Sequence, residues 1–169
     1  DAEFPDVLVM ERGGQSLFIE NVTQRIAGVD AAKVSALFRS ICERVAALHE
    51  LRLIHGDLKL RNVIRRVGDA SRGVCLCDLD AAIEADAARP LDVKLSTAYA
   101  APELQASLRD GVALVARPSL DVWSLGVVLF ELCTGRALFA QDISNDDMVE
   151  ADDQMHLATW SCVPDAAFR

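Results

Sequence analysis

The chain has 169 residues, of which 51% are hydrophobic, so it is long enough and apolar enough for one domain with a substantial core. It contains 17 Lys and Arg against 26 Asp and Glu, a net charge of −9 at pH 7 that argues against nucleic acid or an anionic membrane surface as partner. The acidic N-terminus lacks the apolar core of a signal peptide, and no apolar stretch approaches the ~20 residues that a membrane-spanning helix needs.

The N-terminal segment is expected to form a strand followed by a turn. Val7–Met10 is a short apolar run typical of a strand, and Gly13 and Gly14 interrupt it. No third glycine follows at the spacing of a phosphate-cradling loop, so this turn is not interpreted as one.

The clearest helix is predicted over residues 30–50. Asp30 has the side chain of a good N-cap, because its carboxylate can accept from the free N–H groups of the first turn. Apolar residues then recur at steps of three and four, which makes one stripe along a helix. The stripe consists of Val34, Leu37, Phe38, Ile41, Val45 and Leu48.

The segment His55–Asn62 is the most informative part of the chain. It carries a carboxylate at Asp57, an ammonium at Lys59 and a carboxamide at Asn62. Phosphoryl transfer uses such a set, because an acceptor orients a hydroxyl, a cation offsets phosphate charge and an oxygen ligand holds a metal. A lone Asp or Asn in a loop is more often a turn residue, so the interpretation depends on the segments that follow.

Two of these segments follow directly. Val74–Asp78 is an apolar run that ends in an acid, which predicts a short buried strand with a carboxylate at its tip. Residues 81–95 show no clear period. Ser96–Glu103 then reads S-T-A-Y-A-A-P-E, and its Pro-Glu pair suits the start of a helix.

The C-terminal third begins with a predicted helix over Asp121–Leu132, which is almost entirely apolar and is expected to be buried. Gly135 suits the left-handed turn that ends such a helix. Residues 142–160 show a weaker helical pattern. They also hold a group of acids, which is most simply a solvated face; the sharper interpretation is a preference for basic peptide substrates.

Taken together, four segments resemble the motifs of eukaryotic serine/threonine protein kinases, in the same order along the chain. His55–Asn62 is similar to the catalytic loop H-R-D-L-K-x-x-N, with Gly56 in place of Arg. Asp78-Leu79-Asp80 is similar to D-F-G. Ser96–Glu103 is similar to the end of an activation segment, T-x-x-Y-x-A-P-E, and Asp121–Gly126 to the central helix that begins D-V-W-S-x-G.

The resemblance implies a mainly α (α+β) fold, the helical C-lobe of a kinase with short β hairpins around the catalytic loop. Residues 1–17 would be the last N-lobe strand and the hinge, and residues 18–169 a partial, C-terminally truncated C-lobe. The sequence contains neither a G-x-G-x-x-G loop nor a V-A-I-K lysine. The chain is therefore expected to be a fragment or a truncated product that is inactive alone.

The resemblance also implies ATP and Mg²⁺ as cofactors and Ser or Thr of a protein as substrate. Asp57 would orient the substrate hydroxyl, Lys59 would offset charge on the γ-phosphate, and Ser96 would hydrogen-bond both. Asn62 and Asp78 would be the Mg²⁺ ligands. Because Gly56 removes the arginine that pairs with an activation-loop phosphate, activity is not expected to depend on such a phosphate.

Further roles follow from the same resemblance. Met10 would be the gatekeeper beside the adenine, the backbone from Glu11 to Gly13 would bind the adenine edge, and Ile64 would form part of the floor. Four residues would support the site from outside it, with Leu79 filling part of the space of the D-F-G phenylalanine. These are His55, Leu79, Glu103 and Asp121.

Two other functions stay open on the sequence. His55–Leu58 also resembles the H-G-D-L loop of aminoglycoside and choline kinases, which phosphorylate small alcohols. The other alternative is a pseudokinase or an isolated C-lobe that binds partners without catalysis. The five cysteines form no disulfide framework and are expected to be buried reduced thiols, which fits the cytosol or nucleus.

Overall fold

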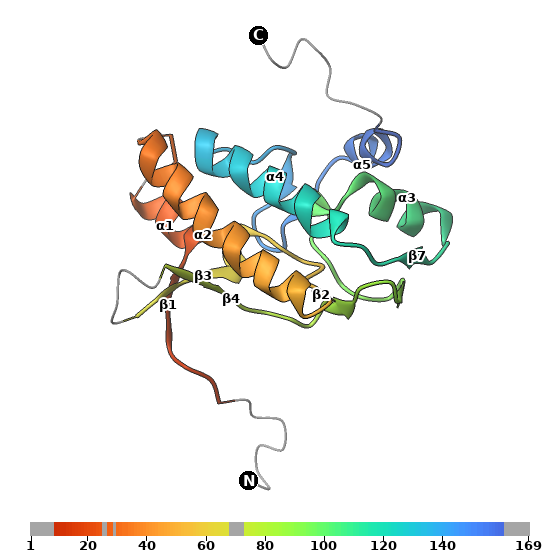
Figure 1. Cartoon of the computed structure of the whole chain (residues 1–169). Coiled ribbons are helices and arrows are strands. Elements are labelled where there is room, and N and C mark those ends of the chain that lie inside the picture. The colour runs from red at the N-terminus through yellow and green to blue at the C-terminus, as the bar shows by residue number, and fades with distance from the viewer. Residues whose placement is uncertain (1–8, 25–26, 29, 68–72, 161–169) are drawn as a thin grey trace, which may run out of the picture.

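The computed structural model describes residues 9–24, 27–28, 30–67 and 73–160. Its centre is a pair of neighbouring helices, α2 (Ala31–Glu50) and α4 (Ser119–Thr134), with a small sheet packed on α2 and a second helical group, α3 and α5, beyond α4 (Figure 1). No helix in these ranges is long and apolar enough to cross a bilayer. The predicted mainly α (α+β) fold is confirmed.

Helix α2 begins and ends where the sequence predicts. The Asp30 carboxylate accepts from Ala32 N at 2.9 Å and from Lys33 N at 3.2 Å, which satisfies two N–H groups of the first turn. Its buried face carries Val34, Leu37, Ile41 and Val45. The helix therefore supplies one wall of the main core, against which the sheet packs.

The sheet has three antiparallel strands in the order β1-β3-β4: β1 (Gly13–Ser16), β3 (Val63–Arg66) and β4 (Val74–Leu76). Ile64 is opposite Cys75 in the β3–β4 pair. Strand β3 starts directly after Asn62, and β4 ends two residues before Asp78. Because Cys77 N donates to Asn62 O at 3.0 Å, the hairpin brings these two predicted metal ligands to one edge.

The N-terminal segment differs from the prediction. Val9 and Met10 have no regular structure and are 88% and 67% exposed; residues 7 and 8 lie outside the described ranges. The strand lies instead on the glycines, and a Cβ built at Gly13 would lie 2.7 Å from Ile64 Cγ2. The sequence predicted that the two glycines interrupt a strand. They are instead the residues that allow β1 to approach β3 closely. Helix α1 (Leu17–Gln24), anchored by the fully buried Leu17, was not predicted.

Helices α3 (Pro102–Asp110) and α4 confirm the predicted helix start at Pro102 and the central helix. Gly111 (φ 64°) and Gly135 (φ 69°) are the left-handed residues that end them. The core between them is smaller and separate, with Trp123 packed against both cores. The second core consists of Ile54, Ala100, Ala101, Leu104, Ala116 and Leu120.

Short strand pairs hold the loops. β2 (Leu53–Ile54) pairs with β5 (Ile83–Glu84), and β6 (Ala88–Arg89) pairs with β7 (Leu114–Val115). These two strand pairs hold the segment 81–95, which has no hydrophobic period of its own. Two turns of 3₁₀ helix complete the loops: η1 (Leu60–Asn62) lies between β2 and β3, and η3 (Thr97–Tyr99) lies between β6 and α3.

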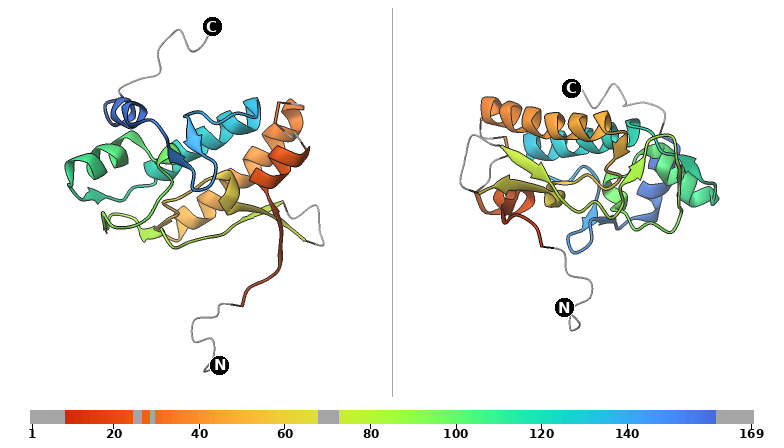
Figure 2. Two further views of the ribbon diagram at one scale, coloured as in Figure 1. Left: turned by 180° about the vertical axis from the view of Figure 1, so that it is seen from behind. Right: turned by 60° about the horizontal axis from the view of Figure 1, so that its bottom comes forward.

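The weak helical pattern over 142–160 is only half correct. Residues 141–148 form the hairpin of β8 (Gln141–Asp142) and β9 (Asp147–Met148), and helix α5 is limited to Ala151–Ala158. The right-hand view of Figure 2 shows this hairpin, in blue, projecting on the side of the molecule away from helices α2 and α4. Asx turns explain the error, because Asp142 Oδ1 accepts from Ser144 N at 2.8 Å and Asn145 Oδ1 from Asp147 N at 3.0 Å.

The cysteines are less buried than expected. Cys42, Cys75 and Cys77 are half-buried and Cys133 is exposed; all four are free thiols, and Cys162 lies outside the described residues. Burial raises the pKa of the Cys42 and Cys77 thiols, with the neighbouring Asp78 adding to the effect at Cys77.

Candidate active site

The side chain of Asp121 supports the loop that carries the site. Its carboxylate is fully buried at the start of α4 and accepts from His55 N at 2.9 Å and from Gly56 N at 3.0 Å. His49 Nε2, from α2, lies 2.7 Å from Asp121 Oδ2. One carboxylate thus fixes the backbone that leads into Asp57. This agrees with the supporting role under the catalytic loop that the resemblance implies for Asp121.

His55 supports the same backbone from its other side. The ring is fully buried, and Asp57 N donates to Nδ1 over 3.4 Å. That assignment leaves the proton on Nε2, which lies 3.2 Å from Cys77 O. The histidine therefore links the loop that carries Asp57 to the strand end that carries Asp78.

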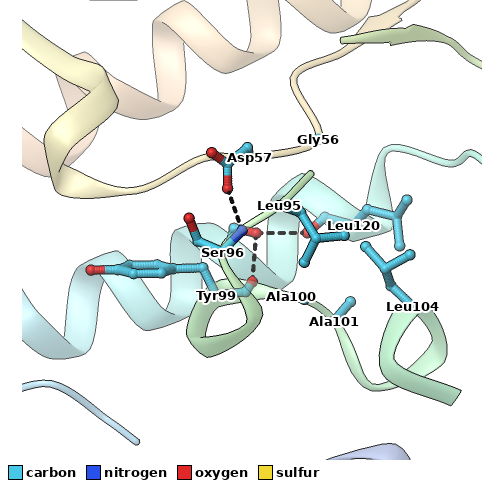
Figure 3. A pocket seen from close by; sticks show the side chains of 10 residues that line it. Gly56, Asp57, Leu95, Ser96, Tyr99, Ala100, Ala101, Leu104 and Leu120 are labelled. Carbon is cyan, nitrogen blue, oxygen red and sulfur yellow. Dashed lines mark hydrogen bonds between the residues drawn. The ribbon is translucent and has the colours of Figure 1, made fainter. Parts of the chain in front are cut away.

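Asp57, Lys59, Asn62 and Ser96 come together although Ser96 is far away in the chain. Ser96 N donates to Asp57 Oδ1 at 2.9 Å, and Lys59 Nζ donates to Ser96 Oγ at 2.6 Å (Figure 3 shows the first of these bonds). Lys59 Nζ also lies 3.4 Å from Asp57 Oδ2. Asp57 Oδ2 accepts from Asn62 Nδ2 at 3.4 Å, so it is held over longer distances than Oδ1, which accepts from Ser96 N at 2.9 Å.

The two predicted metal ligands differ in their surroundings. Asn62 is 5% exposed, and its Nδ2 donates to Asp57 O at 2.8 Å, so Oδ1 is the atom with which it could bind the predicted metal. Asp78 is exposed, with φ +61°, and lines a cleft of about 280 Å³ together with Asp57 and Lys59. A carboxylate and a carboxamide oxygen suit Mg²⁺, which borrows its other ligands from phosphates and water.

No group of three or more His, Cys, Asp or Glu side chains in the described ranges forms a metal site by itself. The fit to Mg²⁺ therefore depends on the Asn62 carboxamide, the Asp78 carboxylate and oxygens that a nucleotide would bring. Asp80 also lines the cleft and adds a third hard oxygen donor nearby.

The β8–β9 hairpin closes the far side of the cleft, which the sequence did not indicate. Asp146 is 1% exposed, and Arg61 Nε donates to its Oδ1 at 3.0 Å. Asp146 Oδ2 lies 3.2 Å from Lys59 Nζ but accepts no well-aligned hydrogen bond among the described residues, so this contact is electrostatic. The guanidinium of Arg61 also lies 3.7 Å above the ring centre of Phe18.

This cluster limits one of the sequence interpretations. Asp146 is buried against two cations, and Asp147 Oδ1 accepts from Thr97 N at 3.2 Å. Neither acid is a freely solvated charge, so any attraction of basic substrates would depend on the remaining acids of 142–153.

The segment after Ser96 is tied to α4 by a buried polar pair. Tyr99 OH donates to both oxygens of Glu131 at 2.8 Å, and Ser124 Oγ donates to Tyr99 O at 2.9 Å. Burial raises the pKa of Glu131 to about 7, although the Tyr99 hydroxyl acts to lower it. Burial, and then the charge of Glu131, likewise raise the pKa of Tyr99 far above its ordinary value.

The predicted supporting and adenine-side residues are less constrained. Leu79 is 49% exposed in the described chain, and its expected role in the place of the D-F-G phenylalanine stays a prediction. Glu103 is exposed and accepts from Ser119 Oγ at 3.4 Å. Glu11 is exposed, Ile64 is half-buried beside Gly13, and the adenine roles of these residues and of Met10 stay predictions.

Comparison with known proteins gives consistent matches. The protein kinase domain family matches residues 6–167. A serine/threonine-protein kinase US3 homolog of Cercopithecine herpesvirus 9 is 35% identical over 144 residues, which is 79% of this chain and 36% of that protein. The US3 homolog of varicella-zoster virus is 36% identical over 119 residues, 64% of this chain and 26% of that protein.

A solved kinase domain superposes with a TM-score of 0.64 and 25% identity, over 78% of this chain and 43% of the solved chain. The chain thus spans between a quarter and just over a third of the length of the two curated relatives named above.

Proposed function

The chain belongs to the eukaryotic protein kinase family, and from this premise we propose that its cleft transfers the γ-phosphoryl group of ATP to serine or threonine of a protein. The observation that carries the proposal is the convergence of Asp57, Lys59 and Ser96 on a loop braced by Asp121. These groups sit at the positions that the kinase pattern assigns to the catalytic acid, its lysine and the residue that joins them.

In the proposed reaction, Asp57 Oδ2 accepts a hydrogen bond from the substrate hydroxyl and takes its proton late. Ser96 N, bonded to Oδ1, prevents the carboxylate from rotating away. Lys59 lies beside both groups, where its ammonium offsets charge on the transferred phosphoryl group. Asn62 and Asp78 would hold Mg²⁺, which supplies neutralisation of the phosphate charge when it is bound.

The decisive experiment is phosphorylation by the full-length natural protein, measured on serine, threonine and tyrosine peptides with labelled ATP. Asp57→Asn keeps the shape of the side chain but removes the negative charge and the oxygen that can take a proton, and we expect kcat to fall roughly 10²–10⁴-fold. Asp86→Asn is the matched control, because Asp86 is an exposed acid that pairs only with Arg52 and Arg117 among the described residues.

Equal activity of Asp57→Asn and the parent protein would contradict the proposed role of Asp57. Transfer to tyrosine peptides alone would contradict the substrate class. Loss of activity on phosphatase treatment would contradict the proposal that Gly56 makes an activation-loop phosphate unnecessary.

A second candidate function concerns the 169 residues taken alone. They contain neither the G-x-G-x-x-G loop nor the V-A-I-K lysine, and catalysis of this kind is largely positioning of the phosphates. We propose that the isolated chain is inactive and acts at most as a binding module, with residues 1–17 as the hinge side. Binding of a nucleotide without turnover, unaffected by Asp57→Asn, would support this candidate.

The similarities favour a protein substrate over a small alcohol, since both herpesvirus relatives are named serine/threonine-protein kinases. A reducing compartment, cytosol or nucleus, is proposed on the free thiols. Transfer of phosphate to an aminoglycoside or to choline, in the same assay and with no peptide labelling, would favour the small-molecule alternative.

A further inference from the structure

Arg89 is a buried cation that the proposed mechanism does not use. It lies in β6 within the segment 81–95 and is only 2% exposed. Its Nη1 donates to Ala81 O at 3.3 Å, whereas Nη2 is buried without a hydrogen-bond partner in the described part of the chain. A guanidinium remains charged at neutral pH, and a buried charge is costly unless nearby charges or hydrogen bonds compensate.

The compensating charges are those of the site itself. Burial lowers the pKa of Arg89, and the carboxylates of Asp57 and Asp121 act in the opposite direction. These are the proposed catalytic acid and the residue that braces its loop. The arginine is therefore electrostatically coupled to the centre of the cleft, although it comes from a separate segment.

The absence of a side chain at Gly56 leaves space for the guanidinium of this arginine. The φ of Gly56 is +77°, and a Cβ built on it would lie 2.8 Å from Arg89 Nη1 and 2.5 Å from Ala81 O. Any side chain at residue 56 would have to displace both groups, in addition to the strain of a left-handed backbone. The loop position that carries arginine in the kinase pattern is thus a glycine here, and an arginine from the 81–95 segment packs against it.

The backbone of Arg89 is anchored independently of the catalytic loop. Arg89 is opposite Leu114 in the β6–β7 pair, and Ala116 N donates to Ala87 O at 2.8 Å. Ala116 O in turn accepts from Asp86 N at 2.8 Å. These bonds fix β6 on the connection between α3 and α4, so the backbone that carries the guanidinium is held by a part of the chain other than the catalytic loop.

We propose that Arg89 is a positioning residue for phosphoryl transfer: its guanidinium packs against Gly56 and ties segment 81–89 to the catalytic loop, which holds Asp57 in place without a phosphate on that segment. The proposal rests on the proposed function, because it assigns Arg89 a role in the reaction of that cleft. It goes further by naming the group that takes over from the arginine absent at residue 56.

The kinetic test uses the full-length natural protein. Arg89→Gln keeps most of the side-chain volume and a donor but removes the charge, and Arg89→Ala removes the side chain. A displacement of reacting groups by about 1 Å costs roughly 10²-fold, so we expect kcat to fall by that order while KM for ATP stays near the parent value. Arg117→Ala is the matched control, because Arg117 is exposed and pairs with Asp86 in the same segment.

A rescue experiment separates positioning from general stability. Guanidinium ion at millimolar concentration should restore part of the kcat of Arg89→Ala, whereas urea, its uncharged counterpart of similar shape, should not. Equal effects of guanidinium and urea, or a kcat of Arg89→Gln equal to that of the parent, would overturn the proposal.

Hydrogen exchange by mass spectrometry tests the tether without any catalysis. In Arg89→Gln and Arg89→Ala, amides in 55–58 and in 81–89 should exchange faster, while those in α2 stay protected. Unchanged exchange in 55–58 would overturn the tether even if activity fell. If the parent protein transfers no phosphate, the proposed function fails, and the exchange pattern still decides whether Arg89 holds the loop.

Discussion

Glu131 is a carboxyl group inside an apolar helix face, 5% exposed, and its pKa of about 7 has a consequence for stability. Its ordinary pKa of 4.5 applies in the unfolded chain, so the folded state binds the proton more tightly. The stability contributed by this group is therefore fully present below pH 4.5 and is lost as pH rises through about 7.

We expect Glu131→Gln to remove that part of the pH dependence. The shift corresponds to roughly 3 kcal/mol, so the free energy of unfolding of the parent should fall by up to that amount between pH 4.5 and pH 8, relative to the variant. Urea unfolding of both proteins across this range measures the difference. Parallel curves for the two would show that Glu131 is already ionised near its ordinary pKa.

Tyr99→Phe tests the hydrogen bond to Glu131 from the side of its donor. It removes the hydroxyl that donates to both oxygens of Glu131 at 2.8 Å, leaving a buried acceptor without its donor. We expect a loss of about 1–3 kcal/mol that is larger at pH 8 than at pH 5, because the ionised carboxylate needs the donor more. A loss independent of pH would argue that the packing of the ring, and not the hydrogen bond, is what matters.

At this scale the sequence identified the residues that follow a known loop pattern, and the structure brings Asp57, Lys59, Asn62 and Ser96 together. Their roles in catalysis stay predictions. The partners that come from distant segments could not be found in the same way. Arg89, Glu131 and Asp146 have no local period or spacing that marks them, since each is defined by what it meets across the fold.

Among the elements, the β8–β9 hairpin has the least expected role. Its turn residue Asp146 has φ +61° and joins Lys59 and Arg61, so the hairpin is attached to the catalytic loop through charge. We expect Asp146→Asn, which tolerates the left-handed backbone but removes the charge, to destabilise the protein by about 2 kcal/mol.

The same variant should detach the hairpin before the rest of the fold opens, so hydrogen exchange over 141–148 should accelerate while α4 stays protected. Asp152→Asn is the control, since Asp152 is an exposed acid in the first turn of α5. If both variants behaved alike, the ion cluster would contribute nothing beyond a surface charge.

Helices α2 and α4 were predictable because each carries a long apolar pattern and one recognisable end, the Asp30 N-cap of α2 and the Gly135 C-cap of α4. The failures lie where an element is short. Strand β1 depends on the close approach of two glycines to β3, and the β8–β9 hairpin depends on side chains that bond their own backbone. Neither signal has a period, so both segments were assigned from weaker patterns.

At the scale of the whole molecule, Asp121 joins three parts of the chain: α2 through His49, the catalytic loop through two backbone N–H groups, and its own helix α4. Asp121→Ala would leave both N–H groups and the histidine without their acceptor. We expect a loss of about 3–5 kcal/mol in the free energy of unfolding.

The measurement is the urea midpoint, read at the far-ultraviolet helical signal. Asp110→Ala provides the comparison, because Asp110 is an exposed acid that bonds only the adjacent Arg109 among the described residues. A small change for Asp121→Ala, similar to that of Asp110→Ala, would mean that the loop is held by packing and not by this carboxylate.

The chain contains two tryptophans, and they touch: the rings of Trp123 and Trp160 lie edge to face, 6.0 Å apart and inclined at 79°. One belongs to the central helix α4, and the other follows α5. This pair is therefore an intrinsic spectroscopic probe of whether α5 is packed against the rest of the molecule. Emission and near-ultraviolet dichroism of this pair report that junction directly, so the docking of α5 can be followed in time without attaching a dye.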